Sequence, residues 1–304
     1  MTPSVPLALV GSTASGKTSA SLELARRLDG ELLLIDSMTV YRGMDVGTAK
    51  PSVEEREGIP HHLVDIADPS ERFSVAEFQG LARSAMAAIT ERGRRALLVG
   101  GSGLYFRAVV DELEFPGTEP DLRSTLEAEA RAIGTERMHE RLSAFDPGAA
   151  TKMEPTNARR VVRALEVAAS TGRPFSSFAE GWDRYPEGNV RAAGVRVPPE
   201  VLRRRIEERA TDQLKGGLLE ETQRLLDGGS ERLLTASQAI GYAEAAEHLA
   251  GDITLDEALE KIVRRTKALA RRQMAWFRRD PRIRWFEADS AADAVDEIEE
   301  YFRR

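Results

Sequence analysis

A glycine-rich loop near the start of the chain carries residue types that bind a diphosphate. It fits the pattern G-x-x-x-x-G-K-[ST] and consists of Gly11, Ser12, Thr13, Ala14, Ser15, Gly16, Lys17 and Thr18. The two glycines let the backbone curl so that its N–H groups face an anion, Lys17 adds positive charge, and the Thr18 hydroxyl is placed to ligate Mg²⁺. The loop therefore predicts a phosphate-binding loop (P-loop) with Mg²⁺ as its metal.

A second candidate for chemistry is Asp36, which directly follows the apolar residues 32–35. A carboxylate at the end of such a strand holds Mg²⁺ in many P-loop proteins. The alternative is a simple cap of the strand end. On these two features alone, the chain would be a kinase or another enzyme that binds ATP or a similar nucleotide.

Short apolar runs alternate with helical patterns around these residues. Strands are predicted at 5–10, 31–35, 96–99, 190–197 and 282–286, and helices at 18–28, 75–92 and 200–226. This alternation predicts an α/β fold with a P-loop NTPase-like parallel sheet. From 115 to 189 the strand pattern gives way to helix-rich sequence with many prolines, so we expect an inserted helical domain there and a core formed by residues 1–114 and 190–304.

Composition narrows the class of protein. Apolar residues make up 41% and charged residues 31% of the 304 residues, which is a globular balance. There is no cysteine, which excludes disulfides and thiolate metal sites, and no apolar run is long enough for a membrane helix. We expect a cytoplasmic monomer with no membrane partner.

Positive charge is concentrated in one predicted helix although the formal net charge is −7. Residues 261–284 contain ten Lys or Arg and one acid. Arg264, Arg271 and Arg278 recur every seven residues, and Arg265, Arg272 and Arg279 form a second row with the same spacing. A solvated surface helix normally mixes the two signs, so we favour contact with the phosphates of a nucleic acid over a plain solvated face.

Several sequence blocks, in order along nearly the whole chain, resemble the tRNA dimethylallyltransferases. The blocks are DSMTVYRGMDVGTAKP at 36–51, PHHLVD at 60–65, VGGSGLY at 99–105, NARRVVRALEV at 157–167, AIGY at 239–242 and RRQMAWFR at 271–278. The resemblance implies transfer of a dimethylallyl group from dimethylallyl diphosphate to the N6 amine of the adenosine 3′ of the anticodon in tRNA, with release of pyrophosphate.

The resemblance also implies roles for individual residues. Lys17 and either Arg205 or Arg209 would neutralise the leaving diphosphate, Mg²⁺ would sit on Thr18, and Asp36 would take the proton of the amine. The anticodon stem-loop of tRNA would contact Asp36, Ser37, Met38, Thr39, Ser102, Arg123, Arg159, Arg160, Val161, Val162, Arg163, Arg265 and Arg272.

Three functions from different classes remain open at this point. They are the transferase, a P-loop phosphotransferase, and an RNA-binding switch that depends on a nucleoside triphosphate. The sequence blocks favour the transferase, and release of pyrophosphate without nucleotide hydrolysis would distinguish it from the other two. Adenylate isopentenyltransferases are similar but use free nucleotide; the basic helix and the long insertion favour tRNA.

Overall fold

The chain forms two compact units in a computed structural model that describes residues 5–71, 73–179, 181–229 and 239–304. The larger unit comprises Met1–Phe73, Glu77–Val110 and Pro186–Arg304, and the smaller one comprises Ser74–Ala76 and Asp111–Tyr185. The sequence predicted an insertion at 115–189, so the smaller unit begins and ends a few residues earlier than expected.

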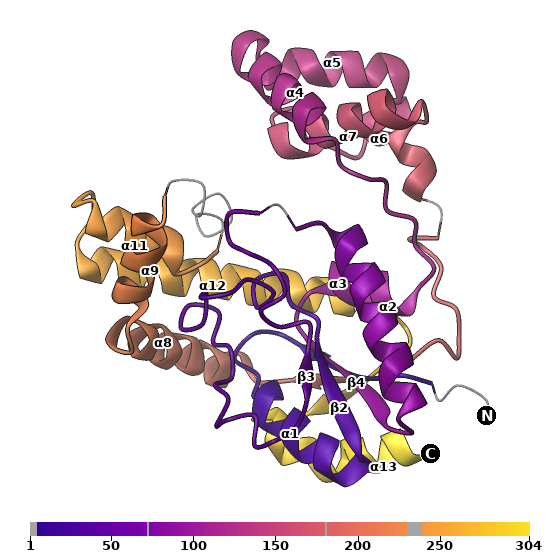
Figure 1. Cartoon of the computed structure of the whole chain (residues 1–304), viewed down its shortest axis with the longest axis vertical. Coiled ribbons are helices and arrows are strands. Elements are labelled where there is room, and N and C mark those ends of the chain that lie inside the picture. The colour runs from indigo at the N-terminus through magenta and orange to yellow at the C-terminus, as the bar shows by residue number, and fades with distance from the viewer. Residues whose placement is uncertain (1–4, 72, 180, 230–238) are drawn as a thin grey trace. The chain divides into compact units, whose positions relative to one another are not determined.

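A six-stranded sheet forms the centre of the larger unit, and all of its neighbouring strands are parallel (Figure 1). Its spatial order is β3 (His61–His62), β2 (Gly30–Leu34), β4 (Arg95–Gly100), β1 (Leu7–Gly11), β5 (Arg191–Arg196) and β6 (Ile283–Glu287). The parallel α/β core predicted from the sequence is thereby confirmed. β3 was not predicted, because two residues are too few to show a periodic pattern.

Helices cover both faces of this sheet because its strands are apolar on both sides. Leu7 and Leu9 face a core that they share with α1 (Lys17–Leu28), η3 (Ala291–Ala294) and α13 (Val295–Arg303). The opposite face meets α12 (Leu255–Phe277), which also packs on α3 (Gly103–Val110). α2 (Val75–Glu91) contacts α3 through the rings of Phe78 and Tyr105, whose centroids are 4.3 Å apart.

The region after β5 forms two helices where the sequence pattern predicted one from 200 to 226. α8 (Pro199–Lys215) ends at Gly216, and α9 (Leu218–Asp227) begins after Gly217, whose φ of 102° lies in the left-handed region. Two consecutive glycines break the helix because the second adopts a conformation that other residues rarely reach. α9 then packs against α11 (Tyr242–Leu249), which contacts α12.

The smaller unit is helical, as expected, with a core of its own. It contains α4 (Pro120–Ile133), α5 (Thr135–Phe145), α6 (Pro147–Ala150), α7 (Ala158–Thr171) and η1 (Phe175–Ala179). Asp146 caps α6 by accepting from the Ala149 amide at 3.0 Å, and Asn157 caps α7 by accepting from the Arg160 amide at 3.2 Å. None of the helices in the described part of the chain is long and apolar enough to cross a membrane.

Candidate functional site

The P-loop joins β1 to α1, and two other elements fix its shape. Gly16 has a φ of 81°, and a side chain there would collide with η3 and the residue before it. The Thr13 amide donates to Gln273 Oε1 of α12 at 2.8 Å, and the Ala291 amide donates to the Ser15 carbonyl at 2.9 Å. The loop is therefore held in its curled form by contacts within the protein.

Lys17 turns back over this loop. Its Nζ donates to the Ser12 carbonyl at 2.5 Å and lies 3.3 Å from Ser15 Oγ. Burial and then the positive charge of Arg209 lower the pKa of Lys17 to about 7, while the negative charge of Asp36 partly opposes this. An anion bound in the loop would supply the missing countercharge.

The structure shows which of the two candidate arginines, Arg205 or Arg209, contacts the P-loop. Arg209 on α8 donates to Thr13 Oγ1 at 3.2 Å and to the Thr48 carbonyl at 3.4 Å. Arg205, one helical turn earlier, donates to the Asp289 carbonyl at 2.6 Å. Burial lowers the pKa of Arg209. Arg209 is thus the arginine directed at the P-loop.

Asp36 lies in the same electrostatic site. Its Oδ1 accepts from the Met38 amide at 2.8 Å and the Thr39 amide at 3.4 Å, which fixes the carboxylate in the turn after β2. The charge of Asp36 favours the protonated forms of both Lys17 and Arg209. The structure therefore brings together the base, the lysine and one of the two arginines that were predicted.

The residues expected around the acceptor base occupy two turns at the ends of β2 and β4. Ser37 and Met38 are half-buried, and Thr39 is buried with a hydroxyl that has no hydrogen-bond partner in the described part of the chain. Ser102 Oγ accepts from the Tyr105 amide at 3.4 Å at the start of α3. Contact of these four residues with the acceptor base stays a prediction.

α12 contacts both the P-loop and the glycine-rich turn that precedes α3. A Cβ added to Gly101 would collide with the Gln273 amide, and one added to Gly103 would collide with the Trp276 ring. Gln273 therefore bridges the turn and the Thr13 amide. Sequence reasoning treated this region only as a basic helix and missed Gln273, whose signal was its place in the RRQMAWFR block.

The predicted tRNA-contacting residues of the smaller unit divide into exposed and buried ones. Arg159 and Arg160 are exposed at the start of α7. Val161 and Val162 are 0% and 2% exposed and belong to the core of this unit. Their side chains pack inside the helical core and are covered by the protein, so tRNA contact at these two positions stays a prediction.

Arg123 and Arg163 bind within the smaller unit. Arg163 donates to the Pro116 and Gly117 carbonyls at 2.6 Å and 3.0 Å. The fully buried carboxylate of Glu166 lies 2.9 Å from Arg163 and 3.7 Å from Arg123. These two arginines stabilise the fold of the unit, so RNA contact is a less direct role for them than for Arg159 and Arg160.

The basic helix divides in a similar way. Arg265 pairs with the buried carboxylate of Glu244, and Lys261 pairs with Glu247 at 2.6 Å. Five other arginines of this region are exposed and make no polar contact with the residues that the structure describes: Arg264, Arg271, Arg272, Arg278 and Arg279. Among the described residues the Arg272 side chain thus has no acidic partner, whereas Arg265 pairs with Glu244.

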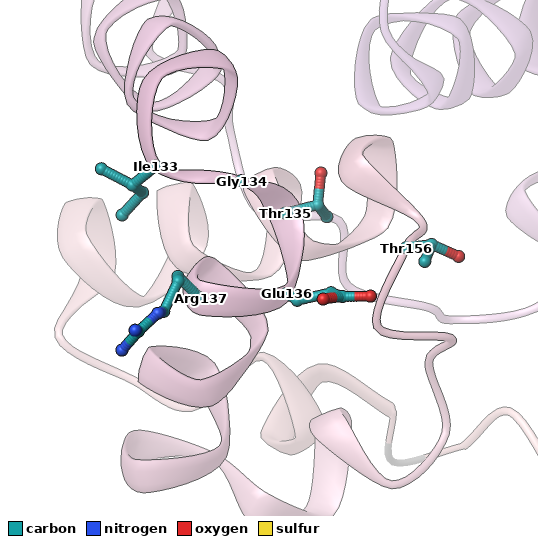
Figure 2. A pocket seen from close by; sticks show the side chains of 6 residues that line it. All are labelled: Ile133, Gly134, Thr135, Glu136, Arg137 and Thr156. Carbon is teal, nitrogen blue, oxygen red and sulfur yellow. The ribbon is translucent and has the colours of Figure 1, made fainter.

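A hollow of about 430 Å³ lies at the turn between α4 and α5 of the smaller unit (Figure 2). Its lining residues are Ile133, Gly134, Thr135, Glu136, Arg137 and Thr156. It contains none of the predicted phosphate-binding or catalytic residues, so it is not the candidate active site.

Comparison with known proteins identifies the family. The sequence profile described as IPP transferase matches residues 39–280. A tRNA dimethylallyltransferase of Nocardioides sp. is 49% identical over 93% of this chain and 91% of its own length. The chain belongs to the IPP transferase family.

Solved structures agree with this assignment. The crystal structure of the tRNA isopentenylpyrophosphate transferase from Bacillus halodurans matches with a TM-score of 0.69 and 42% identity, covering 98% of this chain and 94% of that one. A eukaryotic dimethylallyltransferase acting on tRNA matches with a TM-score of 0.76 and 27% identity, covering 95% of this chain and 74% of that one.

The predicted Mg²⁺ would bind together with a diphosphate rather than at a cluster of protein side chains. No group of three or more His, Asp or Glu side chains converges in the part of the chain that the structure describes. Mg²⁺ at phosphate sites needs only one or two protein oxygens, because phosphates and water complete its shell. The exposed Thr18 hydroxyl in the first turn of α1 is the protein oxygen predicted to take this place.

The low pKa of Lys17 predicts that the protein takes up a proton when it binds a diphosphate. Above about pH 7, Lys17 of the ligand-free protein is largely neutral, and a bound anion raises its pKa. The affinity for diphosphate should therefore fall by up to about tenfold for each unit by which the pH rises above about 7. Calorimetric titration with pyrophosphate in buffers of different ionisation enthalpy measures this uptake. A Lys17→Arg variant is the control, because its cation stays charged; equal uptake in both proteins would contradict the prediction.

Proposed function

We propose that this chain transfers a dimethylallyl group from dimethylallyl diphosphate to the N6 amine of the adenosine 3′ of the anticodon in tRNA. The observation that carries the proposal is the shared site of Lys17, Arg209 and Asp36 at the P-loop. Two cations there fit a leaving diphosphate, and a carboxylate beside them fits a proton acceptor. The names of its relatives, tRNA dimethylallyltransferases, support the same reaction.

In the proposed reaction the amine nitrogen attacks the allylic carbon while the bond from that carbon to the diphosphate oxygen breaks. The electron pair goes to pyrophosphate, whose growing charge Lys17 and Arg209 stabilise. Asp36 takes the amine proton, which matters because the lone pair of the amine is delocalised into the purine. Mg²⁺, held by Thr18, would neutralise further phosphate charge.

The acceptor must leave its stack to reach such a site, and an anticodon loop allows this at low cost. We propose that Arg159, Arg160 and the exposed arginines of α12 bind the tRNA backbone. The enzyme is proposed to act as a monomer in the cytoplasm.

Incubation with tRNA and dimethylallyl diphosphate tests the function directly. We expect mass spectrometry of the digested tRNA to show a dimethylallyl adenosine, together with one pyrophosphate released per product and no hydrolysis of nucleotide. An anticodon stem-loop should also react, while AMP should be a poor acceptor because it offers few contacts to position its amine. Transfer to AMP as efficient as transfer to tRNA would contradict the proposal.

Removal of the proposed base should slow the chemical step. Asp36→Ala is expected to lower the single-turnover rate by about 10² to 10⁴, the usual contribution of a general base. Binding of tRNA, measured by filter retention, should change little. A rate within tenfold of the parent would leave Asp36 with a structural or metal-binding role only.

The exposed arginines of α12 should make tRNA binding salt-dependent despite the acidic chain. Reversal of Arg272 and Arg279 to Glu is expected to weaken binding and to reduce the slope of log affinity against log salt by roughly one to two. Fluorescence titration at several salt concentrations measures this slope.

The matched control reverses two arginines that lie elsewhere and changes the net charge equally. Arg94 directly precedes β4, at the end of the strands opposite the P-loop, and Arg304 is the last residue of the sequence. Their double reversal should leave the slope unchanged. If both double variants shift the slope alike, net charge rather than α12 governs tRNA binding.

A further inference from the structure

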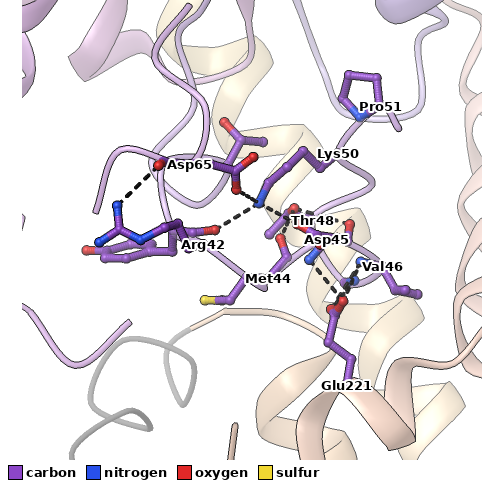
Figure 3. A network of polar contacts seen from close by, with 12 residues as sticks. Arg42, Met44, Asp45, Val46, Thr48, Lys50, Pro51, Asp65 and Glu221 are labelled. Atoms are coloured by element: carbon purple, nitrogen blue, oxygen red, sulfur yellow. Dashed lines mark hydrogen bonds and ion pairs between the residues drawn. The ribbon is translucent and has the colours of Figure 1, made fainter. Parts of the chain in front are cut away.

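The loop after β2 is fixed to α9 by a buried carboxylate (Figure 3). Glu221 of α9, only 3% exposed, accepts from the amides of Asp45, Val46 and Gly47 at 3.1, 3.0 and 3.3 Å. Backbone amides are neutral donors, and three of them converge on one carboxylate. This fixes both the position and the orientation of three consecutive peptide groups.

Tyr242 of α11 completes this arrangement. Its hydroxyl donates to Glu221 and accepts from the Gly47 amide at 3.2 Å. Burial and the neighbouring Glu221 raise the pKa of Tyr242, so the hydroxyl stays protonated and remains a donor. A Cβ added to Gly47 would collide with the tyrosine ring, so the loop passes directly against it.

A third side chain binds the carbonyl groups of the same segment. Gln213 of α8 donates to the Val46 and Gly47 carbonyls at 2.8 and 3.0 Å. We name Glu221, Tyr242 and Gln213 the loop clamp. The clamp binds amides and carbonyls alike, so the segment can neither shift nor turn over without losing hydrogen bonds.

From within the loop, the buried ammonium of Lys50 adds to this rigidity. Its Nζ donates to the Tyr41 carbonyl at 2.8 Å, to Asp45 at 2.5 Å and to Asp65 at 2.6 Å (Figure 3). The side chain of Lys50 is 3% exposed. Lys50 therefore ties the start of the loop to the segment that the clamp holds.

The clamped segment is connected to the candidate active site at both ends. Asp36 begins the same loop, immediately after β2. At the other end Thr48 follows Gly47, and the Thr48 carbonyl accepts from Arg209. Displacement of the segment would thus remove one of the two acceptors that direct Arg209, at one end of a loop whose other end carries Asp36.

We propose that Glu221 and Tyr242 are positioning residues for the transfer reaction: they hold the loop that sets Asp36 and Arg209 against the bound diphosphate. This inference rests on the proposed function. The clamp acts on the rate of the chemical step more than on donor binding, because Lys17 and the P-loop grip the diphosphate without it.

Tyr242→Phe and Glu221→Gln test the proposal, together with their double variant. The first removes only the hydroxyl, and the second turns one acceptor oxygen into a donor that faces backbone donors. We expect single-turnover rates to fall about tenfold for Tyr242→Phe and up to about a hundredfold for Glu221→Gln. The affinity for dimethylallyl diphosphate, measured by calorimetry, should change less than about threefold. The rate effects of the two substitutions should be non-additive in the double variant, because Tyr242 and Glu221 are joined by a hydrogen bond.

Two matched variants control for the chemical changes. Glu220→Gln makes the same substitution at the neighbouring, exposed position of α9, and Tyr301→Phe removes a hydroxyl from α13. Both should keep the parent rate. The rates are compared well below each protein's melting temperature, so that a loss of folded protein cannot imitate a loss of positioning.

Two outcomes would overturn the proposal. In the first, the parent transfers dimethylallyl to tRNA and both clamp variants match its rate. In the second, rate and donor affinity fall together in proportion to lost folded protein, which is the result of a merely structural role. Absence of transfer in the parent enzyme would instead contradict the proposed function.

Discussion

Two half-buried basic side chains, Lys17 and Arg209, lie beside a single carboxylate and set the constraint on which this site depends. The charge of Arg209 and the loss of water lower the pKa of Lys17, and Asp36 compensates only in part. Such an arrangement costs free energy in the empty protein, because like charges are brought together away from solvent. The cost is offset when a diphosphate binds, so the fold stores a preference for that ligand.

The surrounding elements keep this unfavourable arrangement from relaxing. The amide of Thr13 is fixed by Gln273, the carbonyl of Ser15 by η3, and the guanidinium of Arg209 by Thr13 and Thr48. Each of these contacts joins parts of the chain that are far apart in sequence. A preorganised site of this kind stabilises developing charge without rearranging during the reaction.

Sequence alone predicted the parts of this protein that have local patterns. The P-loop, its flanking strand and helix, four further strands and the basic helix all follow from spacing or periodicity. The clamp does not, because Glu221 binds amides some 175 residues earlier in the chain, and nothing around Glu221 distinguishes it from the exposed Glu220. The glycine pair Gly216–Gly217 indicates the break between α8 and α9, but the helical pattern on both sides of it led to the prediction of one continuous helix.

Burial and ion pairing within the protein distinguish among the residues that the sequence predicted to contact tRNA. Val161 and Val162 lie in a block that resembles the tRNA dimethylallyltransferases, and their side chains form part of the core next to the exposed Arg159 and Arg160. Arg163 and Arg265 likewise have protein partners that a sequence cannot show. A sequence motif can thus contain both residues that contact a ligand and residues whose packing positions the contacting ones.

α12 combines two sets of contacts, because Gln273 meets the P-loop, Trp276 packs against Gly103 at the start of α3, and several arginines face solvent. The two sets are free to change at different speeds. Outward positions can exchange one cation for another, or lose one, while the inward pair stays the same. A lineage could therefore adjust how tightly it holds a nucleic acid backbone, step by step, without ever passing through an ancestor whose chemistry had failed.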